Sequence, residues 1–294
     1  MKRWCIVILG VGLAFLIAAE MIAVRQASIA PKRPSSNGNT QFIAVEPNVE
    51  LEVVDFGGTG RPLVLLAGLG GTAHDFGGFS AKLATKYHVY GITRRGFGLS
   101  SAPTSGYGAR RLGDDVVAVI DKLRLVRPIL VGASVAGEEL SSVATFHPNK
   151  VGALIYLDAG YHYAVYDPDS SQPAVDAGFA IIAVGSFFEP LIPAILESKR
   201  VAVYLGARKF TELHVPVLAI FADPHDLSAK YNDAGQRAKA EALDFERTER
   251  QANAFQRRVP AARIVRLPHA SHLVWFSNEA EVWNAMNTFV DSLH

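Results

Sequence analysis

The sequence predicts an α/β fold in which a mostly parallel central sheet carries helices on both faces. Short runs rich in Val, Ile and Leu alternate with longer segments of helical length, the pattern of strands covered on both sides. Hydrophobic residues make up 49% of the 294 residues, enough to bury a large core. One interval, residues 161–213, interrupts the alternation, and we interpret it as a short helical cap insertion because its apolar centre contains Pro190 and Pro193.

The first predicted strands, residues 49–56 and 62–67, flank a Gly-rich turn at 57–60, which predicts a hairpin. The later predicted strands are residues 88–93, 128–133, 152–157, 216–221 and 263–267. The predicted helices between and after them are residues 79–86, 113–123, 138–146, 229–257 and 279–293. Strands that alternate with helices in this order predict parallel pairing.

The amino terminus is predicted to be separate from the folded domain. Lys2 and Arg3 precede residues 4–19, which contain no charged residue, and this order is typical of an export signal. Residues 4–24 are also long enough to cross a bilayer as an uncleaved tether. We therefore expect a signal peptide or membrane anchor at 1–30, a linker at 31–40 and the folded domain at 41–294. The protein is then exported (periplasmic or secreted) or anchored to the membrane.

Composition excludes several classes of function. The formal net charge is +1, and no basic patch with interleaved aromatic residues is present, so we expect no nucleic-acid partner. Cys5, the single cysteine, lies in the amino-terminal segment, which leaves the folded domain without a disulfide or a thiol nucleophile. A small molecule is the expected partner, and no pattern in the sequence fixes the oligomeric state.

Residues 132–137, with the sequence GASVAG, join a predicted strand directly to a predicted helix. Such an abrupt junction forces a strained corner, and small neighbours allow the chain segments to pass close by. If Ser134 occupies the corner, its hydroxyl is exposed above the sheet edge. The amide of Val135 then lies at a helix amino terminus, where it can stabilise an oxyanion.

This stretch resembles the nucleophile elbow, G-x-S-x-G, of the α/β-hydrolase fold family of serine hydrolases, with Ala136 in place of the last Gly. Residues 65–71 (LLAGLGG) are similar to the oxyanion loop of that family, although Ala67 replaces the usual His. By position, the amide of Leu69 is the second expected oxyanion donor. Residues 91–103 resemble the family's R-G-x-G-x-S loop, in which Arg95 is expected to brace loops rather than contact substrate.

The resemblance implies a catalytic base near the carboxyl end. His272 follows the last predicted strand and precedes apolar residues, as the family's catalytic His does, and it is preferred to His269. His74, just past the oxyanion loop, is a candidate pocket residue, although a core or surface role fits it as well. His269 and His272 lack a third ligand at a suitable spacing, so no metal site is predicted.

The resemblance also implies an acid that orients the base. Asp226 has the expected offset after the strand at 216–221, and Asp223 on the same loop is its rival. Asp158, which ends the preceding strand, is a third option because some family members carry the acid there. The order Ser134, Asp226, His272 is the order expected for this fold.

The resemblance implies an exported serine hydrolase that needs no cofactor and cleaves an ester or similar acyl bond. The apolar insertion favours a hydrophobic substrate, with Phe187, Phe188 and Ile192 as candidate lining residues, although packing within the cap explains them equally well. Other enzymatic readings keep the triad but cleave a carbon–carbon or peptide bond, or form a cofactor-free haloperoxidase. A non-catalytic binding protein on the same fold is the remaining alternative.

Overall fold

The computed structural model describes residues 39–161, 163–165 and 213–293. Its strands and helices, in chain order, are β1 (Asn39–Glu46), β2 (Val49–Gly57), β3 (Pro62–Leu66), η1 (Ala73–Phe76), α2 (Gly77–Leu83), β4 (His88–Ile92), α3 (Ala109–Lys122), β5 (Ile129–Ala133), α4 (Ala136–Phe146), η2 (Pro148–Lys150), β6 (Ala153–Leu157), β7 (Val217–Ala222), α8 (Ala234–Arg258), β8 (Arg263–Leu267), α9 (Val274–Ser277) and α10 (Glu279–Asp291). The predicted alternation of strands and helices is confirmed in these ranges.

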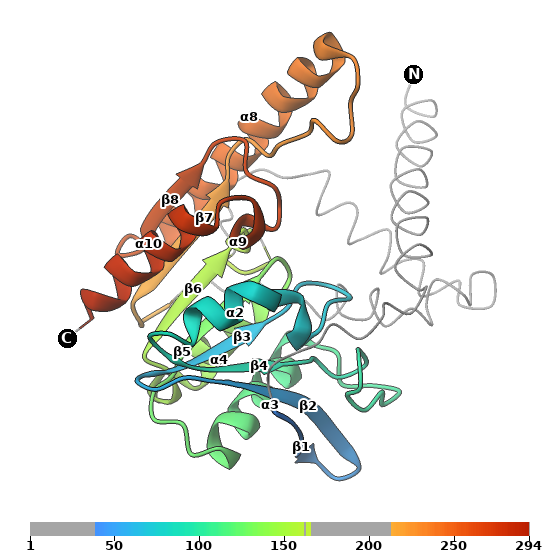
Figure 1. The fold of residues 1–294 in the computed structure, drawn as a ribbon, viewed down its shortest axis with the longest axis vertical. Helices are drawn as coiled ribbons and strands as arrows, with labels where there is room; N and C mark the ends of the chain where they lie inside the picture. The colour runs from blue at the N-terminus through green and yellow to red at the C-terminus, as the bar shows by residue number, and fades with distance from the viewer. Residues whose placement is uncertain (1–38, 162, 166–212, 294) are drawn as a thin grey trace.

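The strands form one eight-stranded sheet in the order β1-β2-β4-β3-β5-β6-β7-β8 (Figure 1). β1 and β2 pair antiparallel, as do β2 and β4, whereas every pairing from β4 through β8 is parallel. The mostly parallel sheet expected from the sequence is therefore present. Its carboxyl edge collects the loops that follow each parallel strand, which is where ligands bind in open α/β sheets.

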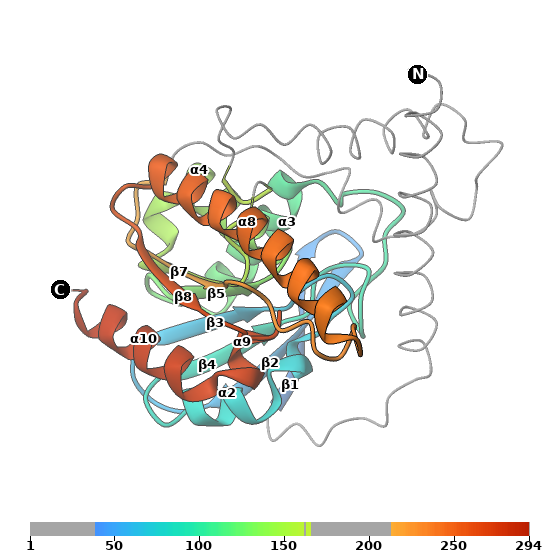
Figure 2. The ribbon, with the colours of Figure 1, turned by 90° about the horizontal axis from the view of Figure 1, so that it is seen from above.

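Helices cover both faces of the sheet, and each face has its own hydrophobic core. Figure 2 shows α3, α4 and α8 along one face and α2, α9 and α10 along the other. Alternate side chains of β3 point to opposite faces of the sheet. Val64 and Leu66 belong to the core under α3, α4 and α8, whereas Leu63 and Leu65 belong to the core under α2, α9 and α10. All four are buried, which explains why the central strands are continuous apolar runs.

The predicted hairpin between the first two strands is wrong. The Gly-rich turn is present, with positive φ at Gly57, Gly58 and Gly60, but the strands on either side of it do not pair. β4 lies between them, antiparallel to β2 and parallel to β3. The turn signal is local, whereas the partner of β2 comes from a segment more than thirty residues further along the chain.

The structure also adds β1, which begins at Asn39 within the predicted linker and pairs with β2 along its length. The predicted signal or anchor at 1–30 lies outside the described residues, as do most of the linker and most of the cap at 161–213. Among the residues that are described, none of the helices has both the length and the apolar character needed to cross a bilayer.

Candidate active site

Ser134 occupies the sharp corner between β5 and α4 that the sequence predicts. Its φ is 50°, in the left-handed region that non-glycine residues seldom adopt. The corner is held by hydrogen bonds from the Ser134 amide to the Leu157 carbonyl at 3.3 Å and from the Gly137 amide to the Ser134 carbonyl at 2.9 Å. The Ser134 side chain is therefore presented at the carboxyl edge of the sheet by a backbone fixed on both sides.

Small residues around the corner are required by close contacts. A Cβ atom on Gly137 would lie 2.1 Å from the Ala159 carbonyl oxygen, so no larger residue fits there without a shift. A Cβ on Gly132 would lie 3.2 Å from the Cβ of Ala136, which shows that the Ala136 methyl group already fills this space. The substitution of Ala for Gly at 136 is thus accommodated by the glycine four residues earlier.

The Gly-rich loop after β3 packs directly on Ser134. A Cβ on Gly68 would lie 3.2 Å from the Ser134 Cβ, so the backbone approaches the serine where only glycine fits comfortably. Leu69 packs against the apolar cluster that contains Val135. The structure therefore brings together the two residues whose amides the sequence predicts as oxyanion donors.

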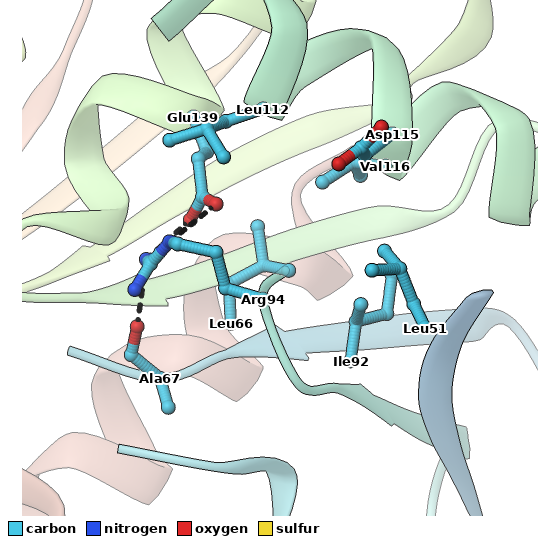
Figure 3. A pocket seen from close by; sticks show the side chains of 9 residues that line it. All are labelled: Leu51, Leu66, Ala67, Ile92, Arg94, Leu112, Asp115, Val116 and Glu139. Atoms are coloured by element: carbon cyan, nitrogen blue, oxygen red, sulfur yellow. Dashed lines mark hydrogen bonds and ion pairs between the residues drawn. The ribbon is translucent and has the colours of Figure 1, made fainter. Parts of the chain in front are cut away.

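A buried arginine, Arg94, ties this loop to the helix that follows Ser134. Its guanidinium donates to the carbonyls of Ala67 at 3.0 Å and Gly68 at 3.3 Å, and it forms a two-pronged ion pair with Glu139 at 2.7 and 2.6 Å. Figure 3 shows the Arg94 head between the Glu139 carboxylate and the Ala67 carbonyl. Arg95, which the sequence predicts to brace loops, is buried and binds Asp115 on α3 and Glu46 at the end of β1.

The pocket drawn in Figure 3 lies beside this ion pair and is lined by residues such as Leu66, Leu112 and Val116. Neither Ser134 nor His272 lines it, and the Arg94 and Glu139 side chains beside it are already paired with each other. We therefore regard it as a packing gap behind the oxyanion loop and place no chemistry in it.

His272 lies in the loop between β8 and α9, and its ring is held by Asp158. The His272 Nδ1 atom is 2.5 Å from Asp158 Oδ2. Within the described parts of the chain, no hydrogen bond joins the His272 ring to the Ser134 hydroxyl. The His272 side chain is 47% exposed, whereas Asp158 is completely buried.

Asp158 follows β6 and is surrounded by hydrogen-bond donors. Its Oδ1 accepts from the Tyr161 hydroxyl at 2.6 Å and the Ala222 amide at 3.0 Å, while its Oδ2 accepts from His225 at 2.8 Å in addition to His272. Burial alone would raise the pKa of Asp158, but the hydrogen bonds from the two histidines outweigh it and lower the pKa to about 2. Asp158 is thus ionised at neutral pH.

The acid preferred from the sequence does not reach His272, so that preference is corrected by the geometry. Asp226 accepts a hydrogen bond from the Ser228 amide at 2.8 Å and its carboxyl group is fully exposed. Asp223 is buried but lies 3.3 Å from Arg266 Nε. Of the three candidate acids, only Asp158, which directly follows β6, contacts His272.

The loop after β7 contributes a histidine that the sequence argument missed. His225 Nε2 lies 2.8 Å from Asp158 Oδ2, and His225 Nδ1 lies 2.7 Å from Asp244 Oδ2. His225 pairs with Ala270 in an isolated parallel bridge, which extends the β7–β8 register to within two residues of His272. A histidine between the two candidate aspartates of this loop was visible in the sequence, but its partner Asp244, nineteen residues away on α8, was not predictable from spacing.

The remaining predicted site residues form no hydrogen bond with Ser134, Asp158 or His272 in the described part of the structure. His74 Nε2 contacts Glu52 Oε1 at 2.9 Å, which ties the ring to β2, and the His74 side chain is 21% exposed. The candidate lining residues Phe187, Phe188 and Ile192 lie outside the described residues. The site as described therefore consists of the loops after β3, β5, β6, β7 and β8.

One group of side chains has the composition of a metal site. Single ligand atoms of Asp158, His225 and His272 all lie within 4.8 Å of one another. His225 Nε2 and His272 Nδ1, however, both contact the same carboxylate oxygen. A nitrogen that donates a proton to a carboxylate cannot bind a metal at the same time, so metal binding through these two nitrogens would require both hydrogen bonds to break.

Comparison with known proteins identifies the family of the chain. Residues 61–255 match the model of a family described as alpha/beta hydrolase fold. The 2-(acetamidomethylene)succinate hydrolase of Mesorhizobium japonicum is 27% identical over 152 residues, which cover 51% of this chain and 50% of that protein. The chain spans about half or less of the length of the curated relatives it matches first.

Solved structures show the same fold at lower identity. An esterase from Rhodococcus has a TM-score of 0.62 at 20% identity, over 87% of this chain and 99% of the other. A bromoperoxidase from Bacillus anthracis has a TM-score of 0.62 at 18% identity, over 86% of this chain and 100% of the other. With its parallel sheet, its serine at a left-handed strand-to-helix corner and a family match over residues 61–255, the chain belongs to the α/β-hydrolase family.

Proposed function

We propose that this protein is a serine hydrolase that cleaves an ester or similar acyl bond of a small, hydrophobic substrate, with Ser134 as nucleophile, His272 as base and Asp158 as acid. The observation that carries the proposal is the 2.5 Å contact between His272 Nδ1 and the buried carboxylate of Asp158. That contact fixes one nitrogen of the ring and leaves Nε2 as the basic one.

The order of the sheet supports the assignment. β5, β6, β7 and β8 are consecutive neighbours, so residues that follow them meet along one stretch of the carboxyl edge. Ser134 follows β5, Asp158 follows β6 and His272 follows β8. Three residues far apart in the sequence therefore follow strands of one stretch of this edge, which supports their assignment as a catalytic triad.

The reaction then proceeds by acyl transfer. Ser134 Oγ forms a bond to the substrate carbonyl carbon while its proton passes to His272 Nε2, and the carbonyl electrons move onto the oxygen. The amides of Leu69 and Val135 stabilise that oxyanion. His272 returns the proton to the leaving group as its bond breaks, and a water molecule, activated in the same way, releases the acid and regenerates the serine. The ionised Asp158 stabilises the His272 cation in both halves of the cycle.

Apolar side chains beside the oxyanion amides support a hydrophobic acyl group. Leu69 and Phe97 pack against the cluster of Tyr107, Leu112 and Val135 next to the serine corner. A solved esterase shares the fold, although its 20% identity does not transfer a substrate. The substrate class therefore rests on the chemistry of the site alone.

Fluorophosphonate labelling tests the proposal, because the probe forms a stable bond with an activated serine. We expect labelling of the wild type at a single peptide that contains Ser134, and loss of labelling in Ser134→Ala. Ser228→Ala is a matched control, since Ser228 is an exposed serine on the loop after β7. Hydrolysis of a chromogenic short-chain ester should fall by orders of magnitude in Ser134→Ala alone.

Labelling of a different serine would overturn the assignment of the nucleophile. A wild type that is inert to both the probe and the ester would instead favour a non-catalytic binding protein on this fold.

We also propose export or membrane anchoring, on the basis of Lys2 and Arg3 before the uncharged residues 4–19. Expression of the full chain followed by fractionation and amino-terminal mass spectrometry tests this. Cleavage near residues 19–30, or retention in the membrane fraction, is expected, and an intact chain in the cytosolic fraction would contradict it.

A further inference from the structure

A second imidazole, His225, shares the carboxylate that holds His272. Both rings contact the same oxygen, Asp158 Oδ2, at 2.8 Å from His225 Nε2 and 2.5 Å from His272 Nδ1. The two ring centroids are 6.0 Å apart. Asp158, the acid of the proposed triad, therefore binds two histidines at once, the proposed base His272 and His225.

The partners of His225 determine its protonation state. Its Nδ1 faces Asp244 Oδ2 at 2.7 Å while its Nε2 faces Asp158. A neutral imidazole carries one N–H, whereas an ionised carboxylate can only accept, so two carboxylate partners require a proton on each nitrogen. The geometry therefore demands an imidazolium at position 225.

The surroundings keep that charge in place. The His225 side chain is only 14% exposed, and burial opposes its charge, but the hydrogen bonds to Asp158 and Asp244 raise the pKa of His225 from 6.5 to about 9. Asp244 is fixed in turn by Arg247 Nη2 at 2.7 Å and by the His225 amide at 2.8 Å. Among the described residues, the titratable and charged groups around His225 are Asp158 and Tyr161 after β6, Asp223 and Asp226 on its own loop, Asp244 and Arg247 on α8, and His269 and His272 after β8.

We propose that His225 is a positioning residue that acts through Asp158: as a cation at neutral pH, it lowers the pH at which His272 becomes available as a base. The proposal rests on the proposed function for its consequence in catalysis. Its physical basis is that His225 partly neutralises the carboxylate that would otherwise favour a cation on His272, and also opposes that cation directly as a like charge.

Two variants separate this electrostatic role from a merely structural one. His225→Gln removes the positive charge but keeps a side-chain N–H that can donate to Asp158. Asp244→Asn removes the negative charge behind His225, and the number of protonated ring nitrogens on His225 in this variant shows whether Asp158 alone holds the imidazolium. The two changes alter the local charge in opposite directions, so an electrostatic role predicts that they shift the titration midpoint of His272 in opposite directions. Loss of packing alone predicts no such opposite shifts.

The titration of the His272 ring, followed by NMR on protein labelled with 15N-histidine, provides the test. We expect the titration midpoint to rise by about one pH unit in His225→Gln and, where His225 retains both ring protons, to fall by a smaller amount in Asp244→Asn. In the wild type at pH 7, His225 should show two protonated ring nitrogens, identified by their loss in His225→Gln. A neutral His225, or an unchanged or lowered His272 midpoint in His225→Gln, would overturn the proposal.

The rate of fluorophosphonate labelling against pH supplies the catalytic readout. Its acid limb should move with the His272 midpoint in both variants, to higher pH in His225→Gln and to lower pH in Asp244→Asn. If the wild type is not labelled at Ser134, the proposed function fails while the NMR titration still decides the role of His225. If His225→Gln does not fold, the ring N–H signals that move in Asp244→Asn identify His225, and their number in the wild type, with the direction of the His272 shift, decides its role.

Discussion

Asp158 and Asp223 are two buried carboxylates in equivalent positions, one directly after β6 and the other directly after the neighbouring strand β7. Asp158 accepts four hydrogen bonds, two on each oxygen. Neither oxygen of Asp223 has a hydrogen-bond partner among the described residues, and its nearest cation, Arg266, is 3.3 Å away and is also bound by Glu249.

The pKa values of the two carboxyl groups are consequently shifted in opposite directions. Burial raises the pKa of Asp223 to about 6, with the nearby carboxylate of Glu249 adding to the effect, whereas donors lower the pKa of Asp158 to about 2 despite equal burial. A place at the carboxyl edge of the sheet is therefore not sufficient to make a charged, orienting acid. The number of donors aimed at the carboxylate decides which strand provides it.

Asp158→Asn should produce the largest effect. An amide at this position cannot stabilise the His272 cation and can hold the ring in the wrong tautomer, and the equivalent change in serine proteases lowers kcat by about 10⁴-fold. We expect ester hydrolysis to fall by roughly 10³- to 10⁴-fold, measured as kcat with a chromogenic ester.

Asp226→Asn is the matched control for that change, because Asp226 was the acid favoured by sequence position. Its carboxyl group is exposed and bound to the Ser228 amide, so the rate should stay within about two-fold of the wild type. A loss in Asp226→Asn as large as that in Asp158→Asn would reverse the comparison between the two loops.

Glu139, another buried carboxylate, extends the comparison of Asp158 with Asp223, because it is bound by a single cation, Arg94. Arg94→Met would leave Glu139 buried without its partner and release the carbonyls of Ala67 and Gly68. We expect the free energy of unfolding to fall by about 3–5 kcal/mol in urea denaturation. The double variant Arg94→Met/Glu139→Gln should recover part of that loss, and the absence of any recovery would show that the packing of Arg94, not the charge of Glu139, is what matters.

Asp223→Asn should have the smallest effect and the opposite sign. Because the folded-state pKa of Asp223 lies above its ordinary value of 3.8, the folded protein holds this proton more tightly, and stability is lost as the pH rises from about 4 through 6. A neutral Asn avoids that loss, so the variant should be more stable than the wild type by about 1 kcal/mol at pH 8. Thermal unfolding at pH 4 should show no such gain, and a gain at both pH values would point to packing instead of charge.

Local patterns were sufficient for most of the fold. Runs of Val, Ile and Leu located the parallel strands, and the corner at Ser134 was predictable because strand, small residues and helix follow one another within a few positions. The pairing of β2 was not predictable, since the Gly57–Gly60 turn favoured a hairpin while β4 supplies the real neighbour. Strand composition specifies burial, but not the order of strands in the sheet.

The candidate site divides in the same way. Ser134 and His272 each carry a local signature, and both are placed at the same edge of the sheet. The partner of His272 depends on which carboxylate collects donors from the end of β7 and from the loops after β6, β7 and β8. The most distant of these donors, His272, lies 114 residues from Asp158 along the chain. Chain position favoured Asp226. Spacing along the sequence contains no information about which donors reach which carboxylate, so it could not identify Asp158 as the partner of His272.

The backbone contact at Gly137 has a practical consequence. Because this glycine rests against the Ala159 carbonyl and the Ser134 amide is bound to Leu157, the proposed nucleophile and the proposed acid belong to one rigid block. His272 comes from an outer strand and is half exposed, so it is the part that can move independently. An engineer who wants to alter turnover without unfolding the enzyme should therefore vary the loop that carries the imidazole and leave the 132–137 and 157–159 segments untouched.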